Sequence, residues 1–158
     1  KQLLLLDETI HARLPQVLAD DLRLRQVLLN LMTNAVKFTP RGSVKLRACP
    51  PMELDSTPIP NGLFVRLEIE DTGIGIPPEK REGVFGKFVQ LDDPQARKER
   101  GAGLGLAISR RLVELMGGSI GLEEGSTGQG TLVWFTLPVC ESAVPEETSS
   151  APPLSGHR

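Results

Sequence analysis

Cysteine is scarce in this chain, and its scarcity argues against sites that depend on paired or clustered thiols. Cys49 and Cys140 lie far apart in the sequence, form no Cys-x-x-Cys pair and have no neighbouring histidine. We therefore expect neither a metal site built on cysteine nor a disulfide. A reducing, cytosolic setting, and so a cytoplasmic location, is the default expectation for such a chain.

Long apolar runs and blocks of basic residues are also missing. The longest apolar run near the start covers residues 3–6, far fewer than the roughly 20 residues that span a bilayer. The formal net charge is -2 and the pI is about 5.8. We therefore expect no nucleic-acid partner and no direct membrane contact by this part of the protein.

The length of 158 residues suits one globular domain with its own core and is too short for a second full domain. Residues 140–158 are rich in proline, serine and glutamate and lack the apolar content for packing, which predicts a disordered tail or linker. The folded domain is therefore expected over residues 1–139. Because the chain begins with lysine rather than methionine, we interpret it as a piece of a longer polypeptide.

Apolar periodicity predicts an α/β fold with a mixed sheet. Alternating or continuous apolar runs predict strands over residues 1–10, 15–19, 43–49, 63–71, 119–123 and 131–137. Helical spacing predicts helices over residues 22–37 and 78–85, and a third that follows residues 101–106 and ends at Gly117 and Gly118. Residues 50–62, with four prolines, read as a surface loop, and residues 91–100 as a mobile loop.

The first candidate binding residue is Asp71, at the end of the strand predicted over residues 63–71. Alternation places Asp71 on the same face as Val65 and Ile69, which points its carboxylate toward the core. A buried carboxylate is costly without hydrogen-bond donors, and no local donor is evident in the sequence, so a ligand amine would fit. Gly73 and Gly75 let the backbone approach a flat group closely. The alternative is a strand that simply ends in a glycine turn.

The second candidate is a polar stripe on the helix predicted over residues 22–37. Asn30, Asn34 and Lys37 follow one another at i, i+4 and i+7, which gathers them beside the apolar face. Asparagine is a poor residue for a helix interior, so two on one stripe are odd if their role is purely structural. Carboxamide oxygens suit a Mg²⁺ ion that is shared with phosphate oxygens.

The third candidate is the glycine-rich segment over residues 101–105, which precedes a helix. Free backbone N–H groups and the positive end of the helix dipole favour phosphate at such a position. A plain turn would have the same residues, and it is the asparagine stripe elsewhere in the chain that favours phosphate binding.

In this order these motifs resemble those of the catalytic, ATP-binding domain of a sensor histidine kinase, within the GHKL (Bergerat-fold) ATPases, over about residues 1–139. Residues 30–39 resemble the N box, 71–75 the G1 box, 85–88 the F box, 101–106 the G2 box and 128–131 the last glycine motif. The resemblance implies a two-layer α+β sandwich with a mostly antiparallel sheet on one layer of helices. One departure is Ala102, where many relatives carry threonine or another small residue.

The resemblance also implies ATP and Mg²⁺ as ligands, with Asp71 accepting a hydrogen bond from the adenine amino group. The implied ATP-binding residues are Asn34, Lys37, Asp71, Gly73, Gly75, Ile76, Phe88, Arg100, Gly101, Ala102, Gly103, Leu104, Gly105, Leu106 and Thr131. The implied metal ligands are Asn30, Asn34 and Gln90, and the implied catalytic residues are Asn30, Asn34 and Lys37.

By the same resemblance, residues 90–100 form a mobile lid over the nucleotide. Arg97, Lys98 and Arg100 are candidates to reach the γ-phosphate, with a solvated run of charges as the alternative. Phe85 and Phe88 either anchor this lid or belong to the core.

The chemistry implied is phosphoryl transfer rather than hydrolysis. Superfamily members that hydrolyse ATP with water carry a glutamate base at the place of Asn30, and an amide cannot take a proton from water. In the histidine kinases the acceptor is a histidine on an upstream dimerisation domain, which makes the full-length protein a homodimer and feeds a response-regulator receiver domain, in the same chain or in another. His11 is no convincing acceptor, because no acidic residue follows it and Pro15 would break its helix. The alternatives are a non-catalytic nucleotide-binding module and a GHKL hydrolase.

Overall fold

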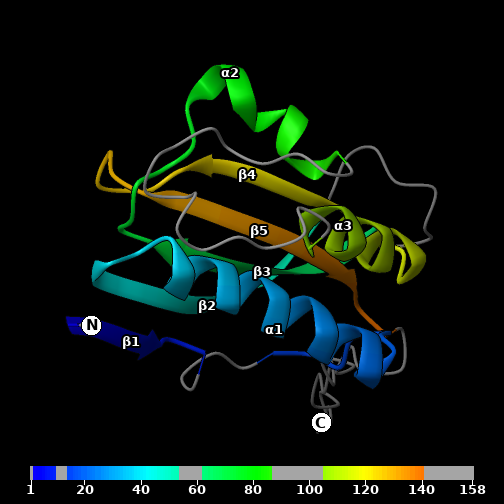
Figure 1. Ribbon diagram of the computed structural model, residues 1–158. Helices are drawn as coiled ribbons and strands as arrows, with labels where there is room; N and C mark the ends of the chain where they lie inside the picture. The colour runs from blue at the N-terminus through cyan, green and yellow to red at the C-terminus, as the bar shows by residue number, and fades with distance from the viewer. Residues whose placement is uncertain (1, 10–13, 54–61, 87–104, 141–158) are drawn as a thin grey trace, which may run out of the picture.

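The computed structural model describes residues 2–9, 14–53, 62–86 and 105–140, without the side chains of residues 50–53. Within these ranges one sheet is covered on one side by helices (Figure 1). The elements, in chain order, are β1 (Gln2–Asp7), α1 (Asp21–Lys37), β2 (Arg41–Glu53), β3 (Leu63–Asp71), α2 (Pro78–Arg81), the 3-10 helix η1 (Gly83–Phe85), α3 (Gly105–Leu115), β4 (Ile120–Glu124) and β5 (Thr131–Pro138).

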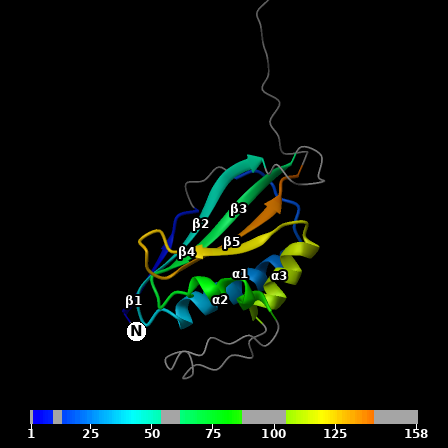
Figure 2. The same cartoon turned by 90° about the horizontal axis from the view of Figure 1, so that it is seen from above.

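The sheet has the strand order β1-β2-β3-β5-β4. β1 pairs with β2 in parallel, and the three other pairings are antiparallel. Seen from above, the helices all lie on one side of the sheet, which makes two layers (Figure 2). The predicted two-layer sandwich, with a mixed and mostly antiparallel sheet on one layer of helices, is confirmed.

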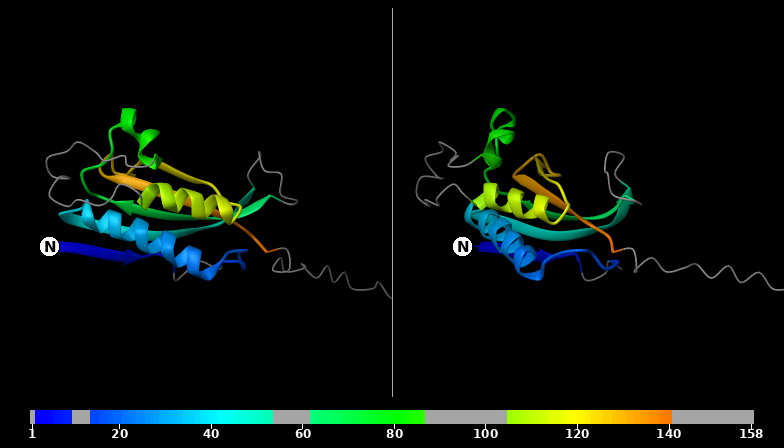
Figure 3. Two further views of the ribbon diagram at one scale, coloured as in Figure 1. Left: turned by 45° about the vertical axis from the view of Figure 1, so that its right-hand side comes forward. Right: turned by 90° about the vertical axis from the view of Figure 1, so that its right-hand side faces the viewer.

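α1 follows the sequence signals closely. The Asp20 side chain caps its first turn by accepting a hydrogen bond from the Arg23 N–H at 3.0 Å, as a helix N-cap should. Val27, Leu31 and Ala35 recur at the helical spacing and are buried between α1 and the sheet. α1 and α3 run side by side on this face (Figure 3). The buried core consists of Val27, Leu31, Ala35, Val44, Ile69, Val113, Met116, Phe135 and Leu137.

Three predicted elements were wrong in their extent. Residues 15–19 form no strand, and only Val17 makes an isolated bridge, to Val139. β2 continues to Glu53, into the predicted loop, because a register irregularity between Cys49 and Met52 accommodates the prolines that cannot donate to a regular ladder. The helix predicted over residues 78–85 is divided into α2 and η1.

Several other predictions fall outside the described residues. These are the mobile loop over residues 91–100, His11, and the tail apart from residue 140, which is described. Among the helices that are described, none combines the length and apolar character needed to cross a membrane.

Candidate nucleotide site

Asp71 ends β3 and is almost fully buried, with 7% of its surface exposed. The Gly73 N–H donates to its Oδ1 at 2.9 Å, and the N–H of Thr131, its direct partner on β5, is near enough to favour the charged carboxylate. The expectation that no local donor serves Asp71 was therefore wrong. Both donors belong to the backbone, so a pattern of side-chain types could not reveal them.

Burial dominates the electrostatics of Asp71 and raises the pKa of its carboxyl above the ordinary value. The hydrogen bonds from Gly73 and Thr131 act in the opposite direction, because they favour the charged carboxylate. The neighbouring Glu70 carboxylate raises the pKa further, and the Thr39 hydroxyl lowers it. The hydrogen bonds from the protein thus offset only part of the cost of burying the charged carboxylate. Its oxygens can accept a further hydrogen bond from another donor.

The turn that follows Asp71 is pressed against the end of α1. A Cβ atom on Gly73 would lie 2.2 Å from the carbonyl oxygen of Phe38, so only glycine allows this approach. The Ile74 N–H donates to the same Phe38 oxygen at 3.2 Å. Gly75 has a φ of 72°, which glycine adopts without strain. The close approach that requires Gly73 is therefore to the protein's own backbone, which fixes the turn beside α1.

Thr39 lies at the same junction and was assigned no role from the sequence. Its side chain is fully buried. A Cβ atom on Gly73 would lie 2.8 Å from Oγ1 of Thr39. Although the hydroxyl is near enough to Asp71 to favour the charged carboxylate, it meets normal hydrogen-bond geometry with no described residue. Buried hydroxyl groups in protein cores normally have a hydrogen-bond partner. The hydroxyl of Thr39 is therefore a buried polar group beside Asp71 that has capacity for a hydrogen bond.

Asn30 joins α1 to the first turn of α3. Its side-chain amide donates to the carbonyl oxygen of Gly105 and, at 2.7 Å, to Oγ of Ser109. A Cβ on Gly105 would lie 2.5 Å from Asn30 Oδ1, so glycine is needed for this contact. Asn30, the first residue of the polar stripe, therefore lies against Gly105 at the start of α3. The sequence analysis missed Ser109, which stands one helical turn after Gly105 as a buried polar residue on an apolar face.

Asn34 and Lys37 continue the stripe toward the Asp71 turn, and the axial distance from Asn30 to Lys37 is about 10 Å at 1.5 Å per residue. Lys37 Nζ lies 5.4 Å from the centroid of the Phe38 ring. Within the described ranges, the side chains of Asn34 and Lys37 make no hydrogen bond or ion pair, and no residue there donates to Asn30 Oδ1. These groups can therefore serve a ligand.

Two further predicted contacts border the turn and α3. Ile76 is half-buried, and its carbonyl oxygen accepts a hydrogen bond from Arg81 Nε at 2.9 Å. Leu106 packs against the core from the first turn of α3, and Phe85 is half-buried in η1. The remaining predicted site residues lie outside the described ranges, and their roles stay predictions. They are Phe88, Gln90, Arg97, Lys98, Arg100, Gly101, Ala102, Gly103 and Leu104.

The described geometry thus brings the buried Asp71 carboxylate to the C-terminal end of α1 and places Gly105, the first residue of α3, against Asn30 in the middle of the same helix. The chain belongs to the family of histidine kinase-, DNA gyrase B- and HSP90-like ATPases, whose model matches residues 19–141. The relatives that follow are sensor histidine kinases of this family, which the chain resembles in sequence or in structure.

Curated relatives and solved structures agree on this class. The chain is 38% identical over 142 residues to the sensor histidine kinase GacS of Pseudomonas protegens, covering 90% of the chain and 15% of GacS. It is 46% identical over 132 residues to the sensor histidine kinase AruS of Pseudomonas aeruginosa, covering 84% of the chain and 12% of AruS. The structure of full-length ShkA in complex with AMPPNP matches with a TM-score of 0.66 and 40% identity, covering 91% of this chain and 27% of ShkA. The chain therefore spans only a small part of these relatives.

The burial of Asp71 predicts a gain in stability when its charge is removed. In Asp71→Asn the two backbone donors keep an acceptor oxygen while the desolvated charge is lost, so the free energy of unfolding at pH 7 should rise by about 0.5–2 kcal/mol. The raised pKa of the folded state means that ionisation destabilises the wild type as pH rises through the ordinary carboxyl pKa and then the folded one. The gain should therefore shrink as the pH falls through the folded pKa and be lost below about pH 4. Urea unfolding of both proteins from pH 3 to 8 measures it, and equal stability at pH 7 would contradict the assignment.

Proposed function

We propose that this domain binds Mg·ATP and transfers the γ-phosphoryl group to a histidine on a separate, upstream dimerisation domain. The observation that carries the proposal is the buried Asp71 carboxylate, which accepts from the Gly73 N–H beside the C-terminal end of α1, while Asn30 in the middle of that helix contacts Gly105. This arrangement offers one acceptor for a base and one helix N-terminus for phosphates, joined by a polar stripe.

Asp71 is proposed to accept a hydrogen bond from the exocyclic amino group of adenine. Its carboxyl keeps acceptor capacity beyond the bonds from Gly73 and Thr131, and a neutral amine donor costs less than leaving the carboxylate unsatisfied. Guanine presents a carbonyl oxygen at the corresponding position. That oxygen would face the carboxylate without a hydrogen bond, because both groups are acceptors. A site built around a buried acceptor therefore discriminates strongly between the two bases.

The phosphates are proposed to lie along α1 toward the first turn of α3. Asn34 and Lys37 present side chains that make no hydrogen bond or ion pair with a described residue, and α3 begins at Gly105, where the positive end of the helix dipole favours phosphate. Residues 90–100 are proposed as the lid, with Arg100 and the glycines before Gly105 completing the phosphate contacts.

The donor set fits a magnesium ion that arrives with the nucleotide. The described residues contain no cluster of three or more histidine, cysteine, aspartate or glutamate side chains, so a dedicated all-protein metal cage is not present there. Carboxamide oxygens of Asn30 and Asn34, with Gln90 as a third proposed ligand, match a hard ion that keeps most of its ligands from water and phosphate. When bound, the ion supplies neutralisation of the phosphate charge.

Transfer is favoured over hydrolysis by the contacts of Asn30. Its amide donates to the Gly105 carbonyl and to Ser109, and an ionised glutamate at this place would have no proton to donate to that carbonyl. The position is thus committed to a donor that cannot act as a base toward water. The γ-phosphoryl group is therefore expected to wait for a histidine that is positioned in line with it.

The proposed partners follow from this chemistry. They are the histidine-bearing dimerisation domain, which makes the full-length protein a homodimer, and a receiver domain that takes the phosphoryl group next, in the same chain or in another. We propose that these reactions take place in the cytoplasm.

Adenine specificity is the first consequence to test. Titration calorimetry should show binding of Mg·ATP and ADP, and affinity for GTP lower by at least tenfold, because guanine lacks the amine that Asp71 accepts from. Asp71→Asn should weaken ATP binding by about 1–3 kcal/mol through loss of a charged hydrogen bond. Equal affinities for ATP and GTP would refute the role of Asp71.

The second test concerns the reaction. The chain is mixed with labelled ATP and Mg²⁺, alone and together with the dimerisation domain of its full-length protein, and acid-labile, base-stable label is counted. We expect label only on the dimerisation domain, loss of the label in Asn34→Ala, and no change in His11→Ala. Rapid release of free phosphate would indicate a hydrolase, and binding without any transfer would indicate a non-catalytic module.

A further inference from the structure

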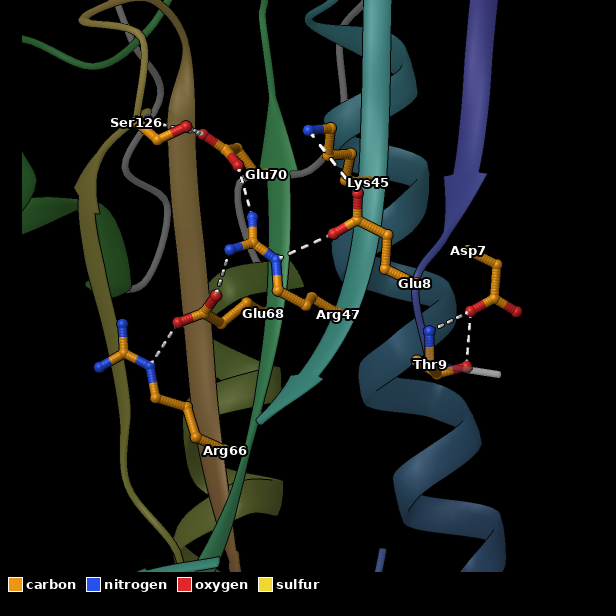
Figure 4. Close-up of polar contacts among 9 residues, drawn as sticks. All are labelled: Asp7, Glu8, Thr9, Lys45, Arg47, Arg66, Glu68, Glu70 and Ser126. Atoms are coloured by element: carbon orange, nitrogen blue, oxygen red, sulfur yellow. Dashed lines mark hydrogen bonds and ion pairs between the residues drawn. The ribbon is translucent and has the colours of Figure 1, made fainter. Parts of the chain in front are cut away.

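The face of the sheet opposite the helices carries a charged network beside the nucleotide site. Strand alternation sends Glu70 to this face, while its neighbour Asp71 points to the helix side. Figure 4 shows Glu70 between Ser126, in the turn that joins β4 to β5, and Arg47 of β2, which stands at the centre of the network. Glu70 is only 6% exposed, which is unusual for a glutamate outside an apolar core.

Each carboxylate oxygen of Glu70 has a different partner. Oε1 accepts from the backbone N–H of Ser126 at 2.6 Å and from its hydroxyl, whereas Oε2 accepts from Arg47 Nη2 at 2.9 Å. Burial alone would raise the pKa of Glu70, but the two bonds from Ser126 and the charges of Arg47 and Lys45 outweigh burial and hold the pKa below its usual range. The carboxylate is therefore charged at neutral pH and can accept all three bonds.

The turn that Glu70 holds, residues 125–130, packs directly on the backbone of Asp71. A Cβ on Gly130 would lie 1.9 Å from the carbonyl oxygen of Asp71, and a Cβ on Gly125 would lie 3.5 Å from the same atom. Thr131, the next residue, pairs with Asp71 in the ladder, and its N–H lowers the pKa of the Asp71 carboxyl. The turn therefore borders one of the two backbone donors to Asp71.

Ser126 is the turn's only side-chain attachment within the described residues. The other two residues of the turn with polar side chains, Thr127 and Gln129, make no side-chain hydrogen bond there. The backbone bonds from the Gly125 N–H to Gly130 O at 3.4 Å and from the Gly128 N–H to Gly125 O at 2.9 Å close the turn on itself but do not attach it to β3. A turn rich in glycine is flexible unless something outside it fixes it.

We propose that Glu70 is a positioning residue, whose carboxylate clamps Ser126 and thereby holds Gly130 and Thr131 against Asp71 in the geometry that receives adenine. This inference rests on the proposed function, because it assigns a determinant of the same base site. Glu70 acts through the turn and contacts no nucleotide. The clamp also ties the base site to Arg47, which forms ion pairs with Glu68 and Glu8 across the open face (Figure 4).

Glu68 provides a matched control. It lies two residues before Glu70 on the same face of β3, is 9% exposed, and pairs with Arg66 Nε at 2.8 Å and Arg47 Nη1 at 3.6 Å. Glu68→Gln therefore removes a buried charge and its arginine pairs without touching the turn. Glu70→Gln likewise removes a buried charge and its pair with Arg47, and it also weakens the acceptor of Ser126, because a neutral amide oxygen replaces the charged carboxylate oxygen.

The first measurement is hydrogen exchange on the nucleotide-free chain. We expect faster exchange at residues 125–131 in Glu70→Gln and wild-type exchange there in Glu68→Gln. Ser126→Ala should show a smaller acceleration, with Thr127→Ala as its control, and this pair decides the question if Glu70→Gln does not fold. Unchanged exchange in both Glu70→Gln and Ser126→Ala overturns the clamp, whether or not the chain binds a nucleotide.

The second measurement is affinity for ADP and for inorganic tripolyphosphate, which has no base. Glu70→Gln should weaken ADP binding about tenfold and leave tripolyphosphate affinity unchanged, and Glu68→Gln should change neither by more than about twofold. Equal losses of ADP affinity in the two glutamine variants, or equal losses for both ligands in Glu70→Gln, refute positioning of the base site. If the wild-type chain binds no ADP, the proposed function is refuted instead. Hydrogen exchange at residues 125–131 then remains the test of whether Glu70 holds the turn.

Discussion

The site depends on one unfavourable arrangement, a carboxylate buried at the end of a central strand. Burying Asp71 is costly, and the protein offsets the cost only in part, with two backbone N–H groups from segments that are distant from each other in sequence. Gly73 donates from a turn that must pack on the end of α1, and Thr131 donates from the start of β5. The glycines around Asp71 are needed because these backbones come too close for any side chain.

Because side chains alternate along a strand, β3 serves two surfaces with adjacent residues. Asp71 faces the helices and the site, and Glu70 faces the charged side of the sheet, where Ser126 and Arg47 satisfy it. On the helix side, Asn30 joins α1 to Gly105 at the start of α3. The proposed adenine end and the proposed phosphate end of the site are therefore both bordered by polar contacts of buried or half-buried side chains.

The sequence was sufficient to predict that Asp71 points to the core and that Asn30, Asn34 and Lys37 share one stripe, because these follow from alternation and helical spacing. The two-layer sandwich was predicted from the resemblance to the family. It was insufficient wherever the backbone is the partner, as with the N–H donors to Asp71. It also missed contacts between distant segments, such as Ser109 with Asn30 and Ser126 with Glu70, since no local period links them. β2 exceeded its predicted end because pairing with β3 overrides the local preference of two prolines.

The most direct test is the pKa of the Asp71 carboxyl, measured by carbon-13 NMR titration of the free protein and of its ADP complex. We expect a pKa above the ordinary 3.8 in the free protein, because burial outweighs the two backbone donors. We expect a lower pKa in the complex, because the adenine amino group then donates to the charged carboxylate. An ordinary pKa in the free protein, or one that ADP leaves unchanged, would contradict the claim that a partly compensated carboxylate is the receptor for adenine.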